Sequence, residues 1–177
     1  MAVLGVIAAR GGSKRFPGKN IAQFRGRPLI AWTILEAQKS TIDTLICSTD
    51  DDDIELTALV HGCRTIRRPD IFATDKATCE DVLRHALALF PHDYVVLLQP
   101  TSPLRTTDDI NQCIFISVCR KEPVVSYCGA YKNGAVYVAP REWVIRNDFT
   151  EPHIHYQMPR ERSLDIDYKE QLDNAQL

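Results

Sequence analysis

The feature that most constrains this fold is a regular alternation of short apolar runs with longer segments of helical spacing. The short runs, rich in apolar and β-branched residues, occupy residues 3–8, 43–49, 63–69, 93–100, 123–129 and 134–140. The segments with helical spacing occupy residues 28–40, 50–62, 78–90, 107–121 and 165–177. Near-continuous apolar strands separated by helices are typical of a parallel sheet covered on both faces. The alternation therefore predicts an α/β fold, Rossmann-like, with a mostly parallel sheet.

Length and composition fit a single domain, 1–177. The 177 residues include 45% hydrophobic ones, enough for one core, and no repeat or linker divides them. The sequence contains no run of 18 or more apolar residues, so no membrane span is expected. The first apolar stretch is not preceded by the basic residues with which a signal sequence begins. Six scattered cysteines without a C-x-x-C pair predict a reducing, cytoplasmic location.

A glycine-rich, basic stretch, "ARGGSKRFPGKN", follows the first apolar run at residues 9–20. In parallel sheets ligands bind beyond the carboxyl ends of strands, and this stretch begins at such an end. Its cations can neutralise a polyphosphate, and its small residues let backbone N–H groups approach one closely. The cations are Arg10, Lys14, Arg15 and Lys19, and the small residues are Gly11, Gly12 and Ser13. A net charge of −2 confines the basic character to this loop, so no nucleic-acid partner is expected.

Two common phosphate loops are excluded by spacing. The pattern G-x-x-x-x-G-K-[ST] fails because one residue too many separates Gly12 from Gly18, and Asn20 stands where a hydroxyl should hold magnesium. The dinucleotide pattern G-x-G-x-x-G fails because Gly11 and Gly12 are adjacent.

The stretch "IAARGGSKRFPGKNI" resembles the first motif of the acylneuraminate cytidylyltransferases, the CMP-sugar synthetases that act on sialic-acid-type sugars. Five further stretches match in order: "ICSTDDDDI", "RRPDIFATD", "LLQPTSPLRT", "NGAVYV" and "MPRERSLDID". Together they span nearly the whole chain. The related synthetases for Kdo use a different first loop, which favours a nonulosonic acid as the acceptor.

The resemblance implies an enzyme with a nucleotidyltransferase fold that joins CTP to the anomeric hydroxyl of a small acidic sugar and releases pyrophosphate. It also implies a divalent cation, Mg²⁺ or Mn²⁺, with Arg10, Lys19 and Asp167 as catalytic residues. Two alternatives stay open at this point: a nucleotide-binding protein of the same fold without transfer activity, and a cytidylyltransferase for another acid sugar such as Kdo.

Asp165 and Asp167 are the candidate metal ligands. On an extended segment, side chains at i and i+2 point to the same side, and carboxylate oxygens suit magnesium. A competing interpretation is that Asp167 caps the last helix, with Glu170 completing a capping box.

The resemblance also assigns residues to the nucleoside and the sugar. Asn20 and Arg68 would contact the nucleoside, and a guanidinium can donate to the acceptors of cytosine. Thr74 and Asp75 would begin a loop over the nucleotide. Cys79 stands where the family usually has a hydroxyl, so Thr78 is the substitute candidate. The residues assigned to the acceptor sugar are Gln99, Thr101, Ser102, Arg105 and Asn133.

The chain departs from the family between two of these stretches. In the family, several dozen residues form a projecting dimerisation element at a position where residues 127–132 of this sequence leave almost no room for it. Either the protein is shortened there, or a loop of the protein is missing from this sequence, and both explanations stay open at this point. A homodimer is possible, but its usual element is absent from this sequence. Lys132 is a candidate replacement for a basic group on the sugar side.

Overall fold

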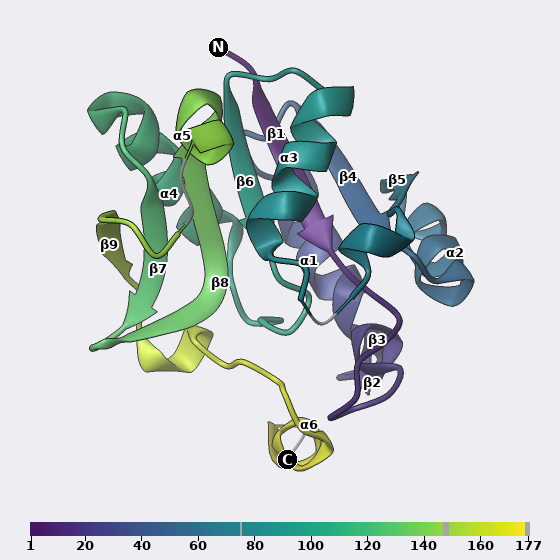
Figure 1. Cartoon of the computed structure of the whole chain (residues 1–177). Coiled ribbons are helices and arrows are strands. Elements are labelled where there is room, and N and C mark those ends of the chain that lie inside the picture. The colour runs from purple at the N-terminus through teal and green to yellow at the C-terminus, as the bar shows by residue number, and fades with distance from the viewer. Residues whose placement is uncertain (75, 147–148, 176–177) are drawn as a thin grey trace.

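In the part of the chain that the structure describes, seven strands form one mixed sheet, and two more form a separate ribbon (Figure 1). The computed structural model describes residues 1–177 except 75, 147–148 and 176–177. The elements are β1 (Val3–Ala8), β2 (Gln23–Phe24), β3 (Arg27–Pro28), α1 (Leu29–Gln38), β4 (Thr44–Thr49), α2 (Asp52–Val60), β5 (Arg64–Arg67), α3 (Cys79–Leu89), β6 (Tyr94–Leu98), α4 (Thr107–Arg120), β7 (Val124–Cys128), β8 (Tyr131–Pro140), α5 (Arg141–Arg146), β9 (Ile154–Gln157) and α6 (Lys169–Ala175). Short 3-10 helices, η1 (Lys19–Ile21), η2 (Asp70–Phe72) and η3 (Arg160–Arg162), lie in connecting segments.

The sheet confirms the predicted fold class and adds one reversal. The strand order is β5-β4-β1-β6-β8-β7-β9. β1 pairs in parallel with β4 and β6, and β5 extends this half in parallel. β8 runs antiparallel to both of its neighbours, β6 and β7, and β9 pairs in parallel with β7. The parallel half therefore gathers the carboxyl ends of β1, β4 and β6 at one edge.

Alternating side chains of the strands supply two large apolar clusters, one on each face. In β6, Val96 and Leu98 enter the cluster that packs against α1, α2 and α4, whereas Val95 and Leu97 enter the cluster that packs against α3 and α5. Figure 1 shows α3 and α5 in front of the sheet. Burial on both faces explains why these strands read as continuous apolar runs.

A third, smaller apolar cluster lies beneath the loop that follows β1. It joins Phe24 of β2 and Leu29 of α1 to Leu172 of α6 and to Ile166, which lies just before α6. The cluster fixes the C-terminal segment against the N-terminal one. The sequence predicted a final helix but not this docking.

The β7–β8 connection is a tight hairpin. Cys128 pairs with Tyr131, so Gly129 and Ala130 make the whole turn. Gly129 has φ of 61°, a left-handed conformation that glycine adopts without strain.

Several local features lie outside the predicted pattern. β2, β3, α5 and β9 are short, and no periodicity marks so few residues.

The six cysteines all lie in the described part and are free. Among the helices of the described residues, none has both the length and the apolar character that crossing a membrane requires.

Candidate functional site

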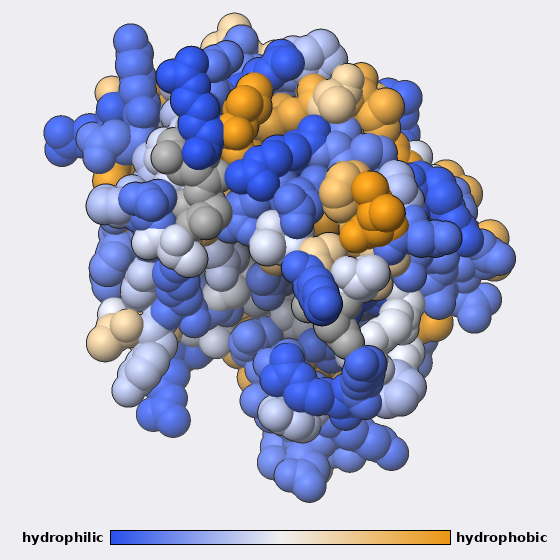
Figure 2. Space-filling view, viewed as in Figure 1, coloured by the Kyte–Doolittle hydropathy of each residue, from blue (hydrophilic) through white to orange (hydrophobic). Residues whose placement is uncertain are grey.

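Two adjoining cavities, of about 450 and 350 Å³, lie at the carboxyl ends of β1 and β6. In the space-filling view, hydrophilic residues dominate this face, and the surface is indented between the part that holds β7 and β8 and the part that holds α6 (Figure 2). The first cavity is lined by Ala8, Arg10, Ser13, Lys14, Arg15, Lys19, Asn20, Cys79, Gln99, Pro100, Thr101 and Asp167. The second shares several of these and adds Arg68, Phe72, Thr74, Ala77, Thr78 and Val82.

The basic loop is held against the start of α2. The Gly11 N–H donates to Asp50 Oδ1 at 3.0 Å, and a Cβ at Gly11 would collide with the side chain of Asp51. A glycine is therefore required at position 11, whereas the space around Gly12 is open. Asn20 is buried, and its Nδ2 donates to the carbonyl of Arg10 at 3.0 Å, which closes the loop from its other end.

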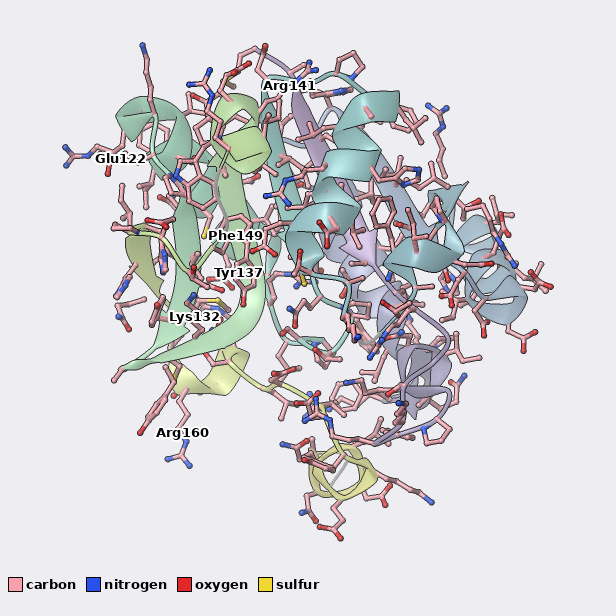
Figure 3. All side chains as sticks on the ribbon, viewed as in Figure 1. Glu122, Lys132, Tyr137, Arg141, Phe149 and Arg160 are labelled. Carbon is pink, nitrogen blue, oxygen red and sulfur yellow. The ribbon has the colours of Figure 1, made fainter. Side chains whose placement is uncertain are left out.

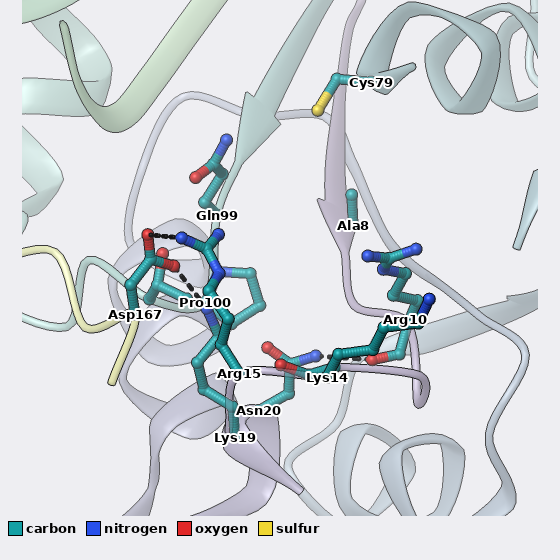
Figure 4. Close-up of a pocket in the computed structure, with 12 residues that line it drawn as sticks. Ala8, Arg10, Lys14, Arg15, Lys19, Asn20, Cys79, Gln99, Pro100 and Asp167 are labelled. Atoms are coloured by element: carbon teal, nitrogen blue, oxygen red, sulfur yellow. Dashed lines mark hydrogen bonds and ion pairs between the residues drawn. The ribbon is translucent and has the colours of Figure 1, made fainter. Parts of the chain in front are cut away.

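Asp167 is paired with two cations of this loop (Figure 4). Lys19 Nζ donates to Asp167 Oδ1 at 2.8 Å, and Arg15 Nη1 lies 3.3 Å from Asp167 Oδ2. The competing interpretation of Asp167 as a helix cap is not what the geometry shows. Gln171 Oε1 accepts from the N–H groups of Asp167 and Tyr168, so the carboxylate of Asp167 faces the loop.

Asp165 lies two residues earlier and is more deeply enclosed. Ile166, between the two acids, is fully buried in the third cluster, and its N–H donates to the carbonyl of Thr101 at 2.9 Å. Asp165 Oδ1 is buried without a hydrogen-bond partner in the described part of the chain. Burial raises the pKa of Asp165 above its ordinary value, and repulsion from Asp167 adds to the effect, whereas the neighbouring Thr101 side chain and the loop cations oppose it.

An unpartnered buried carboxylate oxygen beside a second carboxylate fits a divalent cation. Among the described residues, no three His, Cys, Asp or Glu side chains gather closely enough to hold a metal ion. Asp165 and Asp167 would thus supply two protein ligands, and other oxygens would complete the shell. Magnesium usually binds in this way, through one or two carboxylates together with phosphate oxygens and water.

Of the two residues predicted to contact the nucleoside, Arg68 lines the second cavity and Asn20 lines the first. Arg68 is buried, and its Nε and Nη2 donate to the hydroxyl and carbonyl of Ser48 at 3.3 and 2.7 Å. Burial lowers the pKa of Arg68 from its ordinary value. Thr78 caps α3, with its hydroxyl accepting from Asp81 N at 3.2 Å, while Cys79 borders both cavities. Asp75 lies outside the described residues.

Three residues assigned to the sugar do not line either cavity: Ser102, Arg105 and Asn133. Arg105 is 2% exposed. Its Nη1 donates to the carbonyls of Ala135 (2.6 Å) and Gln99 (3.3 Å), and its Nη2 donates to Thr33 Oγ1 at 2.7 Å. Burial lowers the pKa of Arg105 to about 10. Arg105 therefore ties the end of β6 to β8 and to α1, and it does not line either cavity.

Asn133 is an internal junction. Its Oδ1 accepts from Ser126 Oγ at 2.6 Å, and its Nδ2 donates to Ser163 Oγ at 3.0 Å. Lys132 is also engaged, because its Nζ donates to the carbonyl of Phe149 at 2.7 Å, next to Tyr137 (Figure 3). Neither polar side chain points freely towards a ligand.

Gln99 and Thr101 do line the first cavity, and Gly134 allows Gln99 its place. A Cβ at Gly134 would lie 2.9 Å from Gln99 Oε1, and its φ of 73° is left-handed. The apolar lining residues Ala8, Phe72, Ala77, Val82 and Pro100 were missed from the sequence. They carry no polar group, and apolar residues near strand ends look like core.

The seven-stranded sheet with helices on both faces is the fold of the α/β nucleotidyltransferases. The solved structure of a CMP:2-keto-3-deoxy-manno-octonic acid synthetase complexed with CTP superposes with a TM-score of 0.82 over 99% of this chain and 97% of that one. Its 15% identity supports the fold alone.

The family follows from the sequence matches. The model described as Cytidylyltransferase matches residues 4–126, and the chain belongs to this cytidylyltransferase family. It is 32% identical to the CMP-N,N'-diacetyllegionaminic acid synthase of Legionella pneumophila over 86% of this chain and 84% of that protein. It is 28% identical to the N-acylneuraminate cytidylyltransferase of Escherichia coli over 93% of this chain. The chain spans about half of that E. coli relative, 49%.

Proposed function

We propose that this chain transfers CMP from CTP to the anomeric hydroxyl of a nonulosonic acid, giving a CMP-sugar and pyrophosphate. The observation that carries the proposal is the pairing of Lys19 with Asp167, which are 148 residues apart in sequence. The pairing holds one of the two candidate metal ligands, Asp167, beside the basic loop at the first cavity, which supports the proposal. The names of the relatives support the same chemistry, since they are synthases of CMP-linked acid sugars.

In the proposed reaction, the anomeric oxygen forms a bond to the α-phosphorus of CTP, and the bond from that phosphorus to the bridging oxygen breaks. The electron pair leaves with pyrophosphate, and the hydroxyl proton passes to solvent or to a phosphate oxygen. Lys19 and Arg15 hold the β- and γ-phosphates and stabilise the negative charge that gathers on them. The Gly12 N–H would approach the same phosphates, because the Gly11 N–H already donates to Asp50.

Asp165 and Asp167 would hold a divalent cation, Mg²⁺ or Mn²⁺. When bound, such an ion screens charge between phosphate oxygens as the leaving group departs. Arg68 and Asn20 would orient the nucleoside, and Gln99 and Thr101 would meet the sugar. Thr78, Cys79 and the loop from Thr74 would line the base side.

The short 127–132 junction is proposed to be a true shortening of the family pattern. The direct pairing of β7 with β8 up to the two-residue turn supports this proposal. A dimer, if this chain forms one, would then use another surface. The reducing, cytoplasmic location remains a prediction.

The test is a pyrophosphate-release assay with the four nucleoside triphosphates and a panel of nonulosonic acids and Kdo. We expect release only with CTP, a divalent cation and a nonulosonic acid. Asp165→Ala should abolish metal-dependent release and leave the fold intact, as judged by circular dichroism. Release with Kdo alone would favour the other acid sugar. CTP binding without release for any acceptor would favour a binding protein.

A further inference from the structure

We propose that Asp109 and Arg162 are positioning residues for the metal carboxylates, an inference that rests on the proposed function. Asp109 lies in the first turn of α4, and Arg162 lies in η3. Arg162 Nε donates to Asp109 Oδ2 at 3.0 Å, and Arg162 Nη2 donates to Asp109 Oδ1 at 2.9 Å. This two-pronged contact is called the Asp109–Arg162 fork below.

Asp109 is a buried carboxylate, and both of its oxygens accept hydrogen bonds. It is 0% exposed. Besides the fork, it accepts from Thr106 N at 3.0 Å, from Thr106 Oγ1 at 2.8 Å and from Tyr156 OH at 3.1 Å. Although burial opposes ionisation, the bonds from Arg162 and Thr106 hold the pKa of Asp109 below its ordinary value. A buried charge of this kind is stable only with such partners, so the fork is a rigid attachment point.

The fork acts on the segment that carries the two acids. This acid segment, residues 159–167, leaves β9 and crosses to α6. Its attachments to the body include the fork at Arg162, Ser163 Oγ bonded to Asn133, and Ile166 N–H bonded to Thr101. The carboxylate of Asp167 is also paired with the basic loop. Arg162 is three residues before Asp165, which limits the span between them to about 10 Å.

The placement of the attachments explains why the fork should matter for the metal. Thr101 and Asp109 both belong to the stretch that runs from the end of β6 into α4, and they hold the acid segment on either side of Asp165. The buried Oδ1 of Asp165 can meet a cation only if this stretch of backbone stays in register. Outer partners that orient metal ligands typically change metal affinity by about 10–100-fold when removed.

The chain offers a matched control. Arg160 lies on the same η3 helix, is exposed, and points away from the ribbon (Figure 3). Arg160→Gln removes the same charge from the same short helix without touching the fork. Arg162→Lys keeps the charge but cannot make the bidentate contact, because an ammonium lacks the two parallel N–H donors of a planar guanidinium.

The experiment measures Mn²⁺ binding by electron paramagnetic resonance, with saturating CTP and no acceptor, alongside metal-free CTP affinity and thermal stability. For Arg162→Gln we expect Mn²⁺ affinity about 10–100-fold weaker, with metal-free CTP affinity no weaker than that of the wild type. Arg162→Lys should fall between Arg162→Gln and the wild type, and Arg160→Gln should match the wild type. If Arg162→Gln does not fold, Tyr156→Phe, which removes one bond to Asp109, should weaken Mn²⁺ binding in the same direction.

A lower melting temperature with wild-type Mn²⁺ affinity in Arg162→Gln would overturn the positioning role and leave only a structural one. Wild-type Mn²⁺ affinity in Tyr156→Phe would do the same if the Arg162 variants do not fold. The proposed function fails separately, if the wild-type protein binds Mn²⁺ with CTP but releases no pyrophosphate with any acceptor. Absence of Mn²⁺ binding in the wild type would overturn both.

Discussion

Replacing Asp167 by Asn should change CTP binding in opposite directions with and without metal. Without a ligand, Asp167 accepts from Lys19 at 2.8 Å and pairs with Arg15. If these cations hold the triphosphate, CTP must compete with Asp167 for them, and the carboxylate also repels the phosphates. With metal, the same carboxylate is needed as a ligand. The asparagine variant removes the competition and the ligand together.

The magnitude follows from the Lys19–Asp167 contact. The side chains are 12% and 32% exposed, so the contact is partly buried. A hydrogen bond between charged groups contributes about 1.5–3 kcal/mol of interaction free energy. Because both side chains are partly exposed to solvent, we expect about 1 kcal/mol for this pair. Since about 1.4 kcal/mol is tenfold in affinity, metal-free CTP should bind about fivefold more tightly. With Mg²⁺ the variant should bind CTP about 100-fold more weakly than the wild type, at the upper end of the losses seen for partners of metal ligands.

Isothermal titration calorimetry with CTP, first in EDTA and then with Mg²⁺, measures both quantities. Asp173→Asn, at an exposed position of α6, controls for the change in net charge. The reasoning is refuted if, in EDTA, Asp167→Asn binds CTP no more tightly than Asp173→Asn does. It is equally refuted if Mg²⁺ strengthens binding to the Asp167 variant as much as to the wild type.

Three further substitutions test the site. Because the folded state holds the Asp165 proton more tightly than the unfolded state, the stability from this group is lost as pH rises through its raised pKa. Asp165→Asn should therefore raise the melting temperature at pH 7 but not near pH 4, and a lower value at both would contradict this. Arg105→Met should cost about 3 kcal/mol in urea unfolding, because buried acceptors lose their donors, and a loss below about 1 kcal/mol would remove its tying role. Gly134→Ala should cost about 1–2 kcal/mol through left-handed strain and contact with Gln99, whereas Gly12→Ala, in open space, should leave stability unchanged; equal unfolding midpoints would argue otherwise.

The sequence predicted the elements of the fold better than their directions. The runs that became β1, β4 and β6 are apolar on both faces, and that pattern indicates a covered parallel sheet. The same pattern in β8 says nothing about direction, and β8 is antiparallel. A two-residue connection can join only antiparallel strands, so the short turn before β8 fixes its direction relative to β7. The family resemblance implies a connection of several dozen residues at this position, and so it did not predict this turn.

In the site, the sequence predicted the identity of polar residues but not where their side chains point. The sequence assigns Lys19 to the phosphates and Asp167 to the metal, and the structure brings the two side chains together. Arg105 and Asn133 were chosen on equal grounds, yet both are buried in internal hydrogen bonds. A polar residue after a strand can serve a ligand or a neighbouring backbone, and only the packing of the other strands decides between these uses.

The small cluster of Phe24, Leu29, Ile166 and Leu172 has a consequence for how the site comes apart. The cluster is separate from the two large ones and joins both ends of the chain. Regions that share one small core tend to open as one cooperative unit, with a free energy below that of global unfolding. Amides of the basic loop and of the acid segment should therefore exchange with solvent together, earlier than those of β1 and β6. The first cavity would then lose its basic loop and Asp167 in a single step, while the central sheet stays folded.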